Sequence, residues 1–306
     1  MSLAAIHDDG AADRWHVPVM AEEVCGLIAA HGPLALVDVT VGTGGHAAIL
    51  MRATAARMIG MDRDADALAA ARERLAEFGG RVMLVQRDFA EIKEVLADAG
   101  WDGADGIVAD LGMSSFALDD ASRGFSFRYD GPLDMRMDRR QALTARDLLN
   151  EETEEELARI IYSYGEERAS RRIARMIVEE RRRHLLETTG DLRVIVERAL
   201  GLRRRGGVHP ATRTFQAIRI AVNHEMESLA TLLHDGPAML RPGGRMAVIA
   251  YHSLEDRPVK ERFRELARGG DYIAVTRKAL KAAAAETAHN PRARSARLRC
   301  IERSGT

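Results

Sequence analysis

Glycines and acidic side chains recur in the first third of the chain, each just after a short apolar run. The segment after the first run contains Gly42, Gly44, Gly45 and His46. Glycines permit a tight turn there and let backbone N–H groups approach a ligand closely. Asp62 follows the second run, where a carboxylate can accept hydrogen bonds from both ribose hydroxyls of an adenosine.

The third and fourth apolar runs also end at residues suited to a nucleoside ligand. Phe89 follows the third run and offers a ring that can cover an adenine face. Asp110 and Ser114 follow the fourth run, where the reactive end of a cofactor would lie. Ligands of open parallel sheets bind beyond the carboxyl ends of the strands, so these positions together predict a nucleoside site. For Asp62 the alternative is a cap of the helix that begins near residue 64.

A parallel sheet is needed to bring these residues together, and the pattern of the chain predicts one. Aliphatic runs at 34–39, 57–61, 81–86 and 106–109 alternate with helical stretches at 45–56, 64–78 and 91–99, as in strands joined by crossover helices. Residues 114–210 predict helices at 153–164, 167–184 and 191–200 and no strand. A helix at 212–233, a strand at 245–251, a helix from about 254 and a closing antiparallel pair at 272–276 and 297–301 follow. The sequence therefore predicts a doubly wound α/β sheet with an all-helical insertion after its fourth strand.

Composition restricts the class of protein. The 306 residues are enough for about two domains, and 46% hydrophobic with 30% charged residues is typical of globular chains. No apolar run approaches the ~18 residues of a membrane span. The only two cysteines, Cys25 and Cys300, lie near opposite ends, which predicts neither a disulfide framework nor a metal site. We expect a cytoplasmic protein without a membrane segment.

Charge is unevenly distributed along the chain. Residues 1–150 carry a net charge of −9 and residues 151–306 one of +8. Positive charge is densest over 168–219, which holds 14 arginines against 5 acidic residues and includes Arg203, Arg204 and Arg205. Such a segment attracts phosphates, which favours a nucleic-acid partner. The alternative is a set of solvated helix faces in an arginine-rich chain.

Two cofactor classes fit the glycine-rich segment. Its spacing satisfies the G-x-G-x-x-[G/A] pattern of nicotinamide dehydrogenases. However, a second mononucleotide-binding half does not follow, because the fourth strand leads into the helical insertion. An S-adenosylmethionine enzyme needs one adenosine pocket and an acceptor site near the methyl group, and this class fits better.

Longer blocks of sequence resemble one known family, the RsmH/MraW 16S rRNA (cytosine N4)-methyltransferases. The resemblance covers nearly the whole chain. The blocks that carry it are HVPV at 16–19, DLGMSS at 110–115, LDD at 118–120, RGFSF at 123–127, GPLDMRM at 131–137, HPATRTFQAIRI at 209–220 with Asn223, HSLEDR at 252–257 and NPRARS at 290–295.

The resemblance implies a Rossmann-like methyltransferase fold and a defined reaction. Methyl would pass from S-adenosylmethionine to the exocyclic N4 of a cytidine in the decoding centre of 16S rRNA, within the small ribosomal subunit. The cofactor positions carry over onto Gly44, Gly45, His46, Asp62, Phe89 and Asp110. Where the family usually has Gln after the double serine, this chain has Ala117, so a side-chain contact to the cofactor is expected to be missing or supplied from elsewhere.

The resemblance also assigns domains. Residues 1–115 and 211–306 would form the S-adenosylmethionine-binding methyltransferase domain, and 116–210 the helical insertion that binds substrate RNA. A homodimer is compatible with this organisation. A ribosome-assembly factor without catalysis and a DNA amino-methyltransferase are the remaining alternatives.

Catalytic roles follow as hypotheses. The N4 amine of cytosine is a poor nucleophile, so the enzyme must place it in line with the methyl group and accept its N–H hydrogen bonds. We expect Asp110 and Ser114 to provide acceptors, and His252 and Ser253 to form the opposite wall. A structural, hydrogen-bonded role is the alternative for His252.

Substrate contacts are expected at the borders of the insertion. The cytidine must leave its stack to reach the cofactor. Asp134, Arg136, Arg213 and Asn223 would line the cleft that receives it, together with phosphate contacts from 203–205. The alternative for the four border residues is a polar network between the domains.

Overall fold

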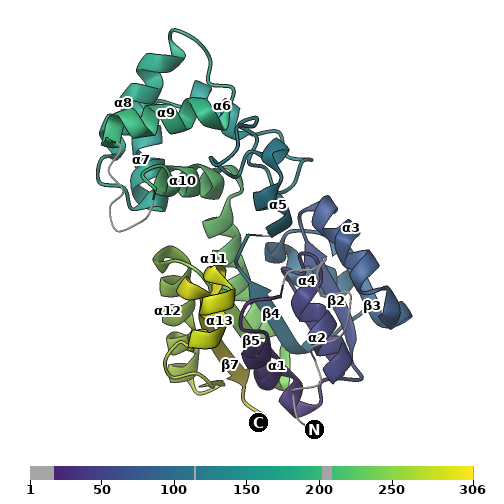
Figure 1. Cartoon of the computed structure of the whole chain (residues 1–306). Helices are drawn as coiled ribbons and strands as arrows, with labels where there is room; N and C mark the ends of the chain where they lie inside the picture. The colour runs from purple at the N-terminus through teal and green to yellow at the C-terminus, as the bar shows by residue number, and fades with distance from the viewer. Residues whose placement is uncertain (1–16, 114, 202–208, 306) are drawn as a thin grey trace. The chain divides into compact units, whose positions relative to one another are not determined.

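The computed structural model describes residues 17–113, 115–201 and 209–305 (Figure 1). The chain forms two compact units. The sheet unit comprises Met1–Ser114 and Met226–Thr306, and the helical unit comprises Ser115–Glu225.

The sheet unit contains a seven-stranded sheet in the order β3-β2-β1-β4-β5-β7-β6. Its strands are β1 (Ala35–Asp38), β2 (Arg57–Asp62), β3 (Val82–Gln86), β4 (Ala104–Asp110), β5 (Leu240–Ala250), β6 (Tyr272–Ala274) and β7 (Arg297–Arg303). The first five are parallel, and β7 pairs antiparallel with both β5 and β6. The doubly wound sheet and its closing antiparallel pair are confirmed. The strand order reverses between β1 and β4, which is where ligands of such sheets bind.

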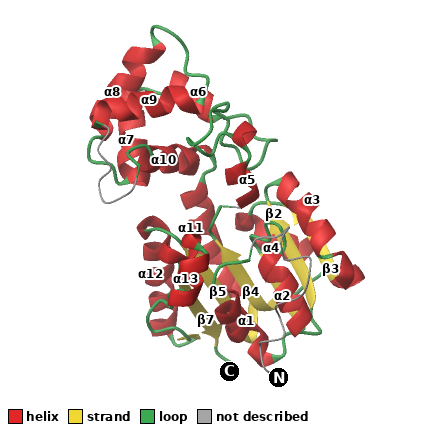
Figure 2. Ribbon diagram, viewed as in Figure 1, coloured by secondary structure: helices red, strands yellow, loops and turns green. Residues whose placement is uncertain are grey.

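Helices cover both faces of this sheet (Figure 2). Successive strand residues point to opposite faces, so Leu36 packs with α1 (Ala21–Ile28), α2 (Gly45–Ala53) and α3 (Ala65–Arg74). Its neighbour Val37 packs with the other layer. That layer contains α4 (Ile92–Asp98), α11 (Glu225–Asp235) and α12 (Ser253–Gly269). Burial on both faces explains why these strands read as continuous aliphatic runs.

The connections between these elements contain short helical segments. One is α13 (Ala284–His289), between β6 and β7. Short 3-10 turns lie at Ala29–His31, Ala76–Arg81, Phe89–Glu91, Ala121–Arg123, Gly236–Met239 and Pro291–Ser295. None of the helices in the described ranges is both long and apolar enough to cross a membrane.

The helical unit is built from capped amphipathic helices. They are α5 (Ser115–Asp119), α6 (Ala145–Glu151), α7 (Glu154–Gly165), α8 (Ser170–Arg181), α9 (Thr189–Leu200) and α10 (Thr212–Val222). Threonines begin three of them: Thr144 and Thr188 form capping boxes with the acid three residues later, and Thr153 accepts from the N–H of Glu156. No β-strand occurs among the described residues of this unit. The apolar faces of the helices pack against one another, and α7 packs on both α8 and α10.

One expected helix is divided in the structure. The sequence predicts a continuous helix over 212–233, but α10 ends at Val222 and α11 begins at Glu225. His224 between them has φ +50°, which is incompatible with a continuous right-handed helix. Because α10 packs on α7, the helical unit extends to Glu225, whereas the sequence places the end of the insertion at residue 210.

Candidate active site

The carboxyl ends of β1, β2 and β4 are joined by backbone hydrogen bonds from the loop after β1. The N–H of Val39 donates to the carbonyl of Val108, and the N–H of Val41 donates to the carbonyl of Met61. The loop then turns through Gly42 (φ +53°) and Gly44 (φ +83°) into α2. Left-handed φ values of this kind favour glycine, so the glycine-rich segment forms the tight turn that its sequence predicts.

Asp62, the last residue of β2, holds this turn. Its Oδ2 accepts a hydrogen bond from the N–H of Gly42 at 2.9 Å, and its Oδ1 accepts from the N–H of Asp64 at 2.9 Å. Withdrawal from water raises the pKa of Asp62 to about 6, although both N–H donors oppose the rise. The cap of α3 is Asp64, which accepts from the N–H of Asp66, so the helix-cap alternative for Asp62 is wrong.

Asp110, the last residue of β4, lies next to His46. Its Oδ2 is 3.8 Å from Nδ1 of His46, and its Oδ1 accepts from the N–H of Gly112 at 3.1 Å. His46 is buried, and its Nε2 is 2.9 Å from the carbonyl oxygen of Val19. A carbonyl only accepts, so Nε2 of His46 donates to Val19 and Nδ1 faces Asp110.

The backbone of Asp110 is held by Thr40, an interaction that sequence reasoning missed. The hydroxyl of Thr40 accepts from the N–H of Asp110 at 2.6 Å. Two loops that are 70 residues apart in the chain are thereby fastened to each other.

A third carboxyl group, that of Asp38, was also missed. Asp38 is 2% exposed at the end of β1, and its Oδ1 accepts from the N–H of Thr40 at 3.2 Å. Burial, together with the negative charges of Asp110 and Asp62, raises its pKa to about 7, although the N–H of Thr40 opposes the rise. The signal in the sequence was an acid inside an otherwise aliphatic strand, since unpaired acids are rarely buried without reason.

Tyr251 is the third residue that sequence reasoning missed, because its position marks only the end of a strand. It directly follows β5, and its phenol lies beside the carboxylate of Asp110. Burial, with the nearby charge of Asp110, raises the pKa of this phenol above its usual value. Space for the ring depends on Gly112, where an added Cβ would lie 2.6 Å from Cε2 of Tyr251. Tyr251 therefore stays a neutral phenol beside Asp110.

Phe89 begins the turn after β3, as expected for a residue beside an adenine. The ring is partly exposed, and the guanidinium carbon of Arg63 lies 5.3 Å from its centroid. Arg63 in turn forms an ion pair with Asp88 at 2.9 Å. The side chains of Arg63 and Asp88 therefore lie beside Phe89 at this strand end. The sequence analysis did not identify either residue.

His252 and Ser253 lie directly after Tyr251, at the start of α12. His252 is the N-cap residue, and its Nε2 is 3.1 Å from Oε1 of Glu255. Glu255 is buried and also accepts from the N–H of Tyr251 at 2.8 Å. The structure thus places both predicted residues at the carboxyl end of β5, and their catalytic role remains a prediction.

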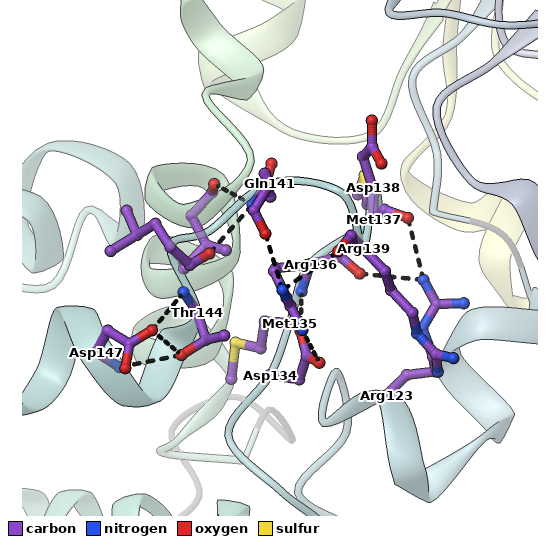
Figure 3. Close-up of polar contacts among 12 residues, drawn as sticks. Arg123, Asp134, Met135, Arg136, Met137, Asp138, Arg139, Gln141, Thr144 and Asp147 are labelled. Carbon is purple, nitrogen blue, oxygen red and sulfur yellow. Dashed lines mark hydrogen bonds and ion pairs between the residues drawn. The ribbon is translucent and has the colours of Figure 1, made fainter.

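In the helical unit, Asp134 and Arg136 bind each other (Figure 3). Nε of Arg136 donates to Oδ1 of Asp134 at 2.7 Å, and its second guanidinium nitrogen donates to Oδ2 at 2.9 Å. Arg136 also donates to the carbonyl of Gln141 at 2.8 Å. Burial would raise the pKa of Asp134, but the hydrogen bonds from Arg136 lower it below its usual value. The pair shapes the loop that contains it.

Asn223 fastens the same loop to α10. Its Oδ1 accepts from the N–H of Met137 at 2.7 Å, and its Nδ2 donates to the carbonyls of Met135 and Arg219 at 2.7 and 2.9 Å. Asn223 is 1% exposed, so in this structure its amide serves the loop. The partners just described for Asp134, Arg136 and Asn223 all belong to the helical unit, so these bonds do not form the expected network between domains.

Arg213 is different, because its side chain is 58% exposed. It donates to the carbonyl of Glu166 at 3.3 Å and reaches to 4.0 Å from Oε2 of Glu167. Ser114 and Arg203, Arg204 and Arg205 lie outside the described residues. Ala117, at the position of the family's usual Gln, is buried.

Comparison with known proteins identifies the family. The model of the MraW methylase family matches residues 13–304. The chain is 50% identical over 290 residues to the ribosomal RNA small subunit methyltransferase H of Sorangium cellulosum, covering 95% of this chain and 91% of that protein. It is 48% identical to the protein of the same name from Symbiobacterium thermophilum, with coverage of 94% and 96%. The crystal structure of the N-methyltransferase NodS from Bradyrhizobium japonicum is 10% identical with a TM-score of 0.43, covering 93% of this chain and 94% of that one. On these matches the chain belongs to the MraW methylase family.

Proposed function

We propose that this protein transfers a methyl group from S-adenosylmethionine to the exocyclic N4 of a cytidine in the decoding centre of 16S rRNA, in the small ribosomal subunit. As a member of the MraW methylase family it is a methyltransferase that uses S-adenosylmethionine. The observation that carries the proposal is the pair of carboxylates, Asp62 and Asp110, at the ends of β2 and β4, the strands on either side of β1 and its glycine turn.

The residues present fit this cofactor. Gly42 is partly exposed, and an added Cβ there would meet nothing nearer than the carbonyl of Thr40 at 3.8 Å, so the face of the turn is open. Asp62 and Phe89 are partly exposed beside it. Each carboxylate oxygen of Asp62 accepts one N–H and retains a lone pair for a ribose hydroxyl, while Phe89 offers a ring to adenine. Gly44, Gly45 and His46 are buried, with Gly44 in the turn itself and the other two at the start of α2.

The reaction at N4 depends mainly on positioning. When bound, S-adenosylmethionine supplies an electrophilic methyl group on a sulfonium. Asp110 accepts a hydrogen bond from the N4 amine and holds the amine in line with that methyl group. The loss of rotational and translational entropy is then incurred when the substrate binds and no longer adds to the activation barrier. Tyr251 donates to the Asp110 carboxylate and fixes its direction.

The amine must also lose a proton once its new N–C bond forms. Asp110 accepts that proton, and the imidazole of His46, with Nδ1 3.8 Å from Oδ2 of Asp110, lies behind it. The imidazole therefore acts behind Asp110 rather than on the cofactor. Ser114, His252 and Ser253 remain candidates for further contacts to the base.

Substrate RNA would be held by the helical unit, with the cytidine turned out of its stack. The exposed guanidinium of Arg213 is suited to a phosphate, as is the arginine run at 203–205. Asp134, Arg136 and Asn223 order the loop at 134–141 of the same unit, Asn223 through its buried amide, so they are not proposed to contact RNA themselves.

The test is methyl transfer to a defined acceptor. Purified protein is incubated with methyl-labelled S-adenosylmethionine and small subunits from a strain that lacks the modification, and the RNA is digested to nucleosides. Labelled N4-methylcytidine is expected. Subunit binding without transfer would leave a non-catalytic assembly role, and label on duplex DNA alone would make the protein a DNA amino-methyltransferase.

A variant pair makes this assay specific for the proposed site. Asp110→Asn should lose transfer at least 100-fold while its affinity for S-adenosylhomocysteine, measured by calorimetry, stays within a fewfold of the parent. Asp98→Asn, at the exposed end of α4, removes the same charge as a control. Equal turnover in both variants would rule out Asp110 as the group that accepts the hydrogen bond and the proton of the N4 amine.

A further inference from the structure

A pocket of about 400 Å³ opens in the sheet unit beside the start of α12. Two segments far apart in sequence line it, and the roles above account for none of its cationic residues. One is the helix start with Tyr251, His252, Ser253, Arg257 and Lys260, and the other is the tail with Lys281, Arg294, Ser295 and Arg297. The motifs HSLEDR and NPRARS thus meet at one place.

The pocket is strongly cationic. Three arginines and two lysines line it, and the only acid in its lining is Asp256. That carboxylate is already neutralised, because Arg299 donates to both of its oxygens at 2.7 and 3.1 Å. Within the described ranges, Lys260, Lys281 and Arg294 have no carboxylate at ion-pair distance. Their charge is therefore available to a ligand.

The backbone around the pocket also suits an anion. α12 is 17 residues long, and its first residue, Ser253, lines the pocket. The N-terminus of a helix attracts negative charge through its N–H groups and its dipole. On the opposite side, Asn290 caps the turn Pro291–Ser295 by accepting from the N–H of Arg292, which fixes the backbone that presents Arg294 and Ser295.

Tyr251 connects this pocket to the candidate active site. It contributes to the pocket lining, and its phenol lies beside the carboxylate of Asp110. A ligand in the pocket is therefore separated by a single side chain from Asp110, the residue proposed to hold the N4 amine. Nucleic-acid binding sites commonly place phosphate contacts in this way, to fix the register of the base that is read or modified.

We infer that this pocket binds a backbone phosphate of the RNA strand next to the target nucleotide, through Lys260, Lys281 and Arg294. The inference rests on the proposed function, and extends it by assigning RNA contact to the sheet unit as well as the helical unit. A phosphate held here restrains the strand on the side of Tyr251, so that the turned-out base reaches Asp110.

The test compares two charge reversals of equal size. Lys260→Glu/Lys281→Glu changes the pocket, and Arg72→Glu/Lys93→Glu changes exposed residues of α3 and α4 that do not line it. Calorimetry with S-adenosylhomocysteine should give the same Kd for both variants and the parent, which shows that each is folded. KM for small subunits should rise at least tenfold in the pocket variant, and less than threefold in the control.

Salt dependence and free phosphate complete the test. The slope of log affinity for subunits against log salt should become shallower by about 1 for each phosphate that the protein no longer binds, in the pocket variant alone. Equal KM and equal slope in the two variants would overturn the inference. If the pocket variant lost only its affinity for inorganic phosphate and bound subunits like the control, the pocket would serve a free anion and the inference would again fail. A parent protein that methylates no RNA contradicts the proposed function itself, which is a separate outcome.

Discussion

The carboxylate of Asp62 accepts a hydrogen bond from the N–H of Gly42, with 2.9 Å between Oδ2 and nitrogen. This hydrogen bond ties the end of β2 to the turn after β1, across 20 residues of chain. The acid that the cofactor's ribose would meet is thus already oriented by the loop that would cradle the rest of the ligand. Preorganisation of this kind reduces the cost of ordering on binding.

Cofactor affinity should depend on pH through Asp62. Its pKa is raised to about 6, and only the ionised carboxylate accepts both ribose hydroxyls. The Kd for S-adenosylhomocysteine should therefore weaken about tenfold from pH 7 to pH 5, as protonation removes the acceptor. Calorimetry across this range measures it.

Two variants separate Asp62 from its neighbour in that experiment. Asp62→Asn should bind at least tenfold more weakly at pH 7 and show little further loss at pH 5. Asp38→Asn should keep the pH dependence of the parent. The assignment fails if the dependence persists in Asp62→Asn.

Stability should fall as pH rises through neutrality, because of Asp38. Its folded pKa of about 7 lies above the usual value near 3.8, so the folded state binds more protons than the unfolded state between these values. The stabilisation is complete below about pH 4 and is lost as pH approaches 7. Asp38→Asn, which can still accept from the N–H of Thr40, should make the free energy of unfolding less dependent on pH, by up to about 1.4 kcal/mol per pH unit. Urea titrations of the cofactor-free protein at pH 5 and 8 test this, and an unchanged slope would speak against a buried, neutral Asp38.

Turnover should depend on the hydroxyl of Tyr251. Tyr251→Phe keeps the ring beside Gly112 and removes the donor to Asp110. We expect kcat to fall about tenfold with KM for the cofactor nearly unchanged, since a positioned acceptor matters most at the barrier. Tyr272→Phe is the matched control, because the hydroxyl of Tyr272, the first residue of β6, donates to the carbonyl of Pro237 and not to an active-site group. Equal kcat values for the two variants would show that the hydroxyl of Tyr251 does not contribute to the positioning of Asp110.

Asn223 should be a stability residue of the helical unit. Asn223→Ala leaves the N–H of Met137 and the carbonyl of Met135 without their partner, whereas the carbonyl of Arg219 keeps the backbone N–H of residue 223. Each buried unpaired group costs about 1 to 3 kcal/mol. We expect a loss of about 3 kcal/mol in the free energy of unfolding, with no change in cofactor affinity. Arg140→Ala, which breaks an exposed ion pair with Asp138, should cost less than about 1 kcal/mol. A similar cost for both variants would mean that the loop does not depend on the buried amide.

RNA affinity should depend on the arginine run at 203–205. Reversal of Arg203, Arg204 and Arg205 to Glu should weaken binding to small subunits at least tenfold and leave cofactor affinity unchanged. Binding measured at several salt concentrations should also show a shallower slope in the variant. Unchanged affinity would mean that these arginines form only a solvated surface.

The secondary structure followed closely from local patterns in the chain. Each strand from β1 to β4 is a short aliphatic run between turn signals, and each is found within a few residues of its expected place. The helix at 212–233 was the exception, since nothing in its periodicity marks the break. The break is decided by the bonds from Asn223 to Met135 and Met137, residues more than 80 positions away.

The sequence by itself determined the elements, the family and the residues that follow strands, because those depend on spacing and on side-chain type. Tertiary structure decided which of these residues share an environment. It buried Asp38 among other acids, placed the phenol of Tyr251 beside Asp110, and brought the segments around 257 and 294 into one cationic pocket. Burial, charge and hydrogen-bond direction depend on groups that are distant in the chain, so local sequence carries no direct record of them.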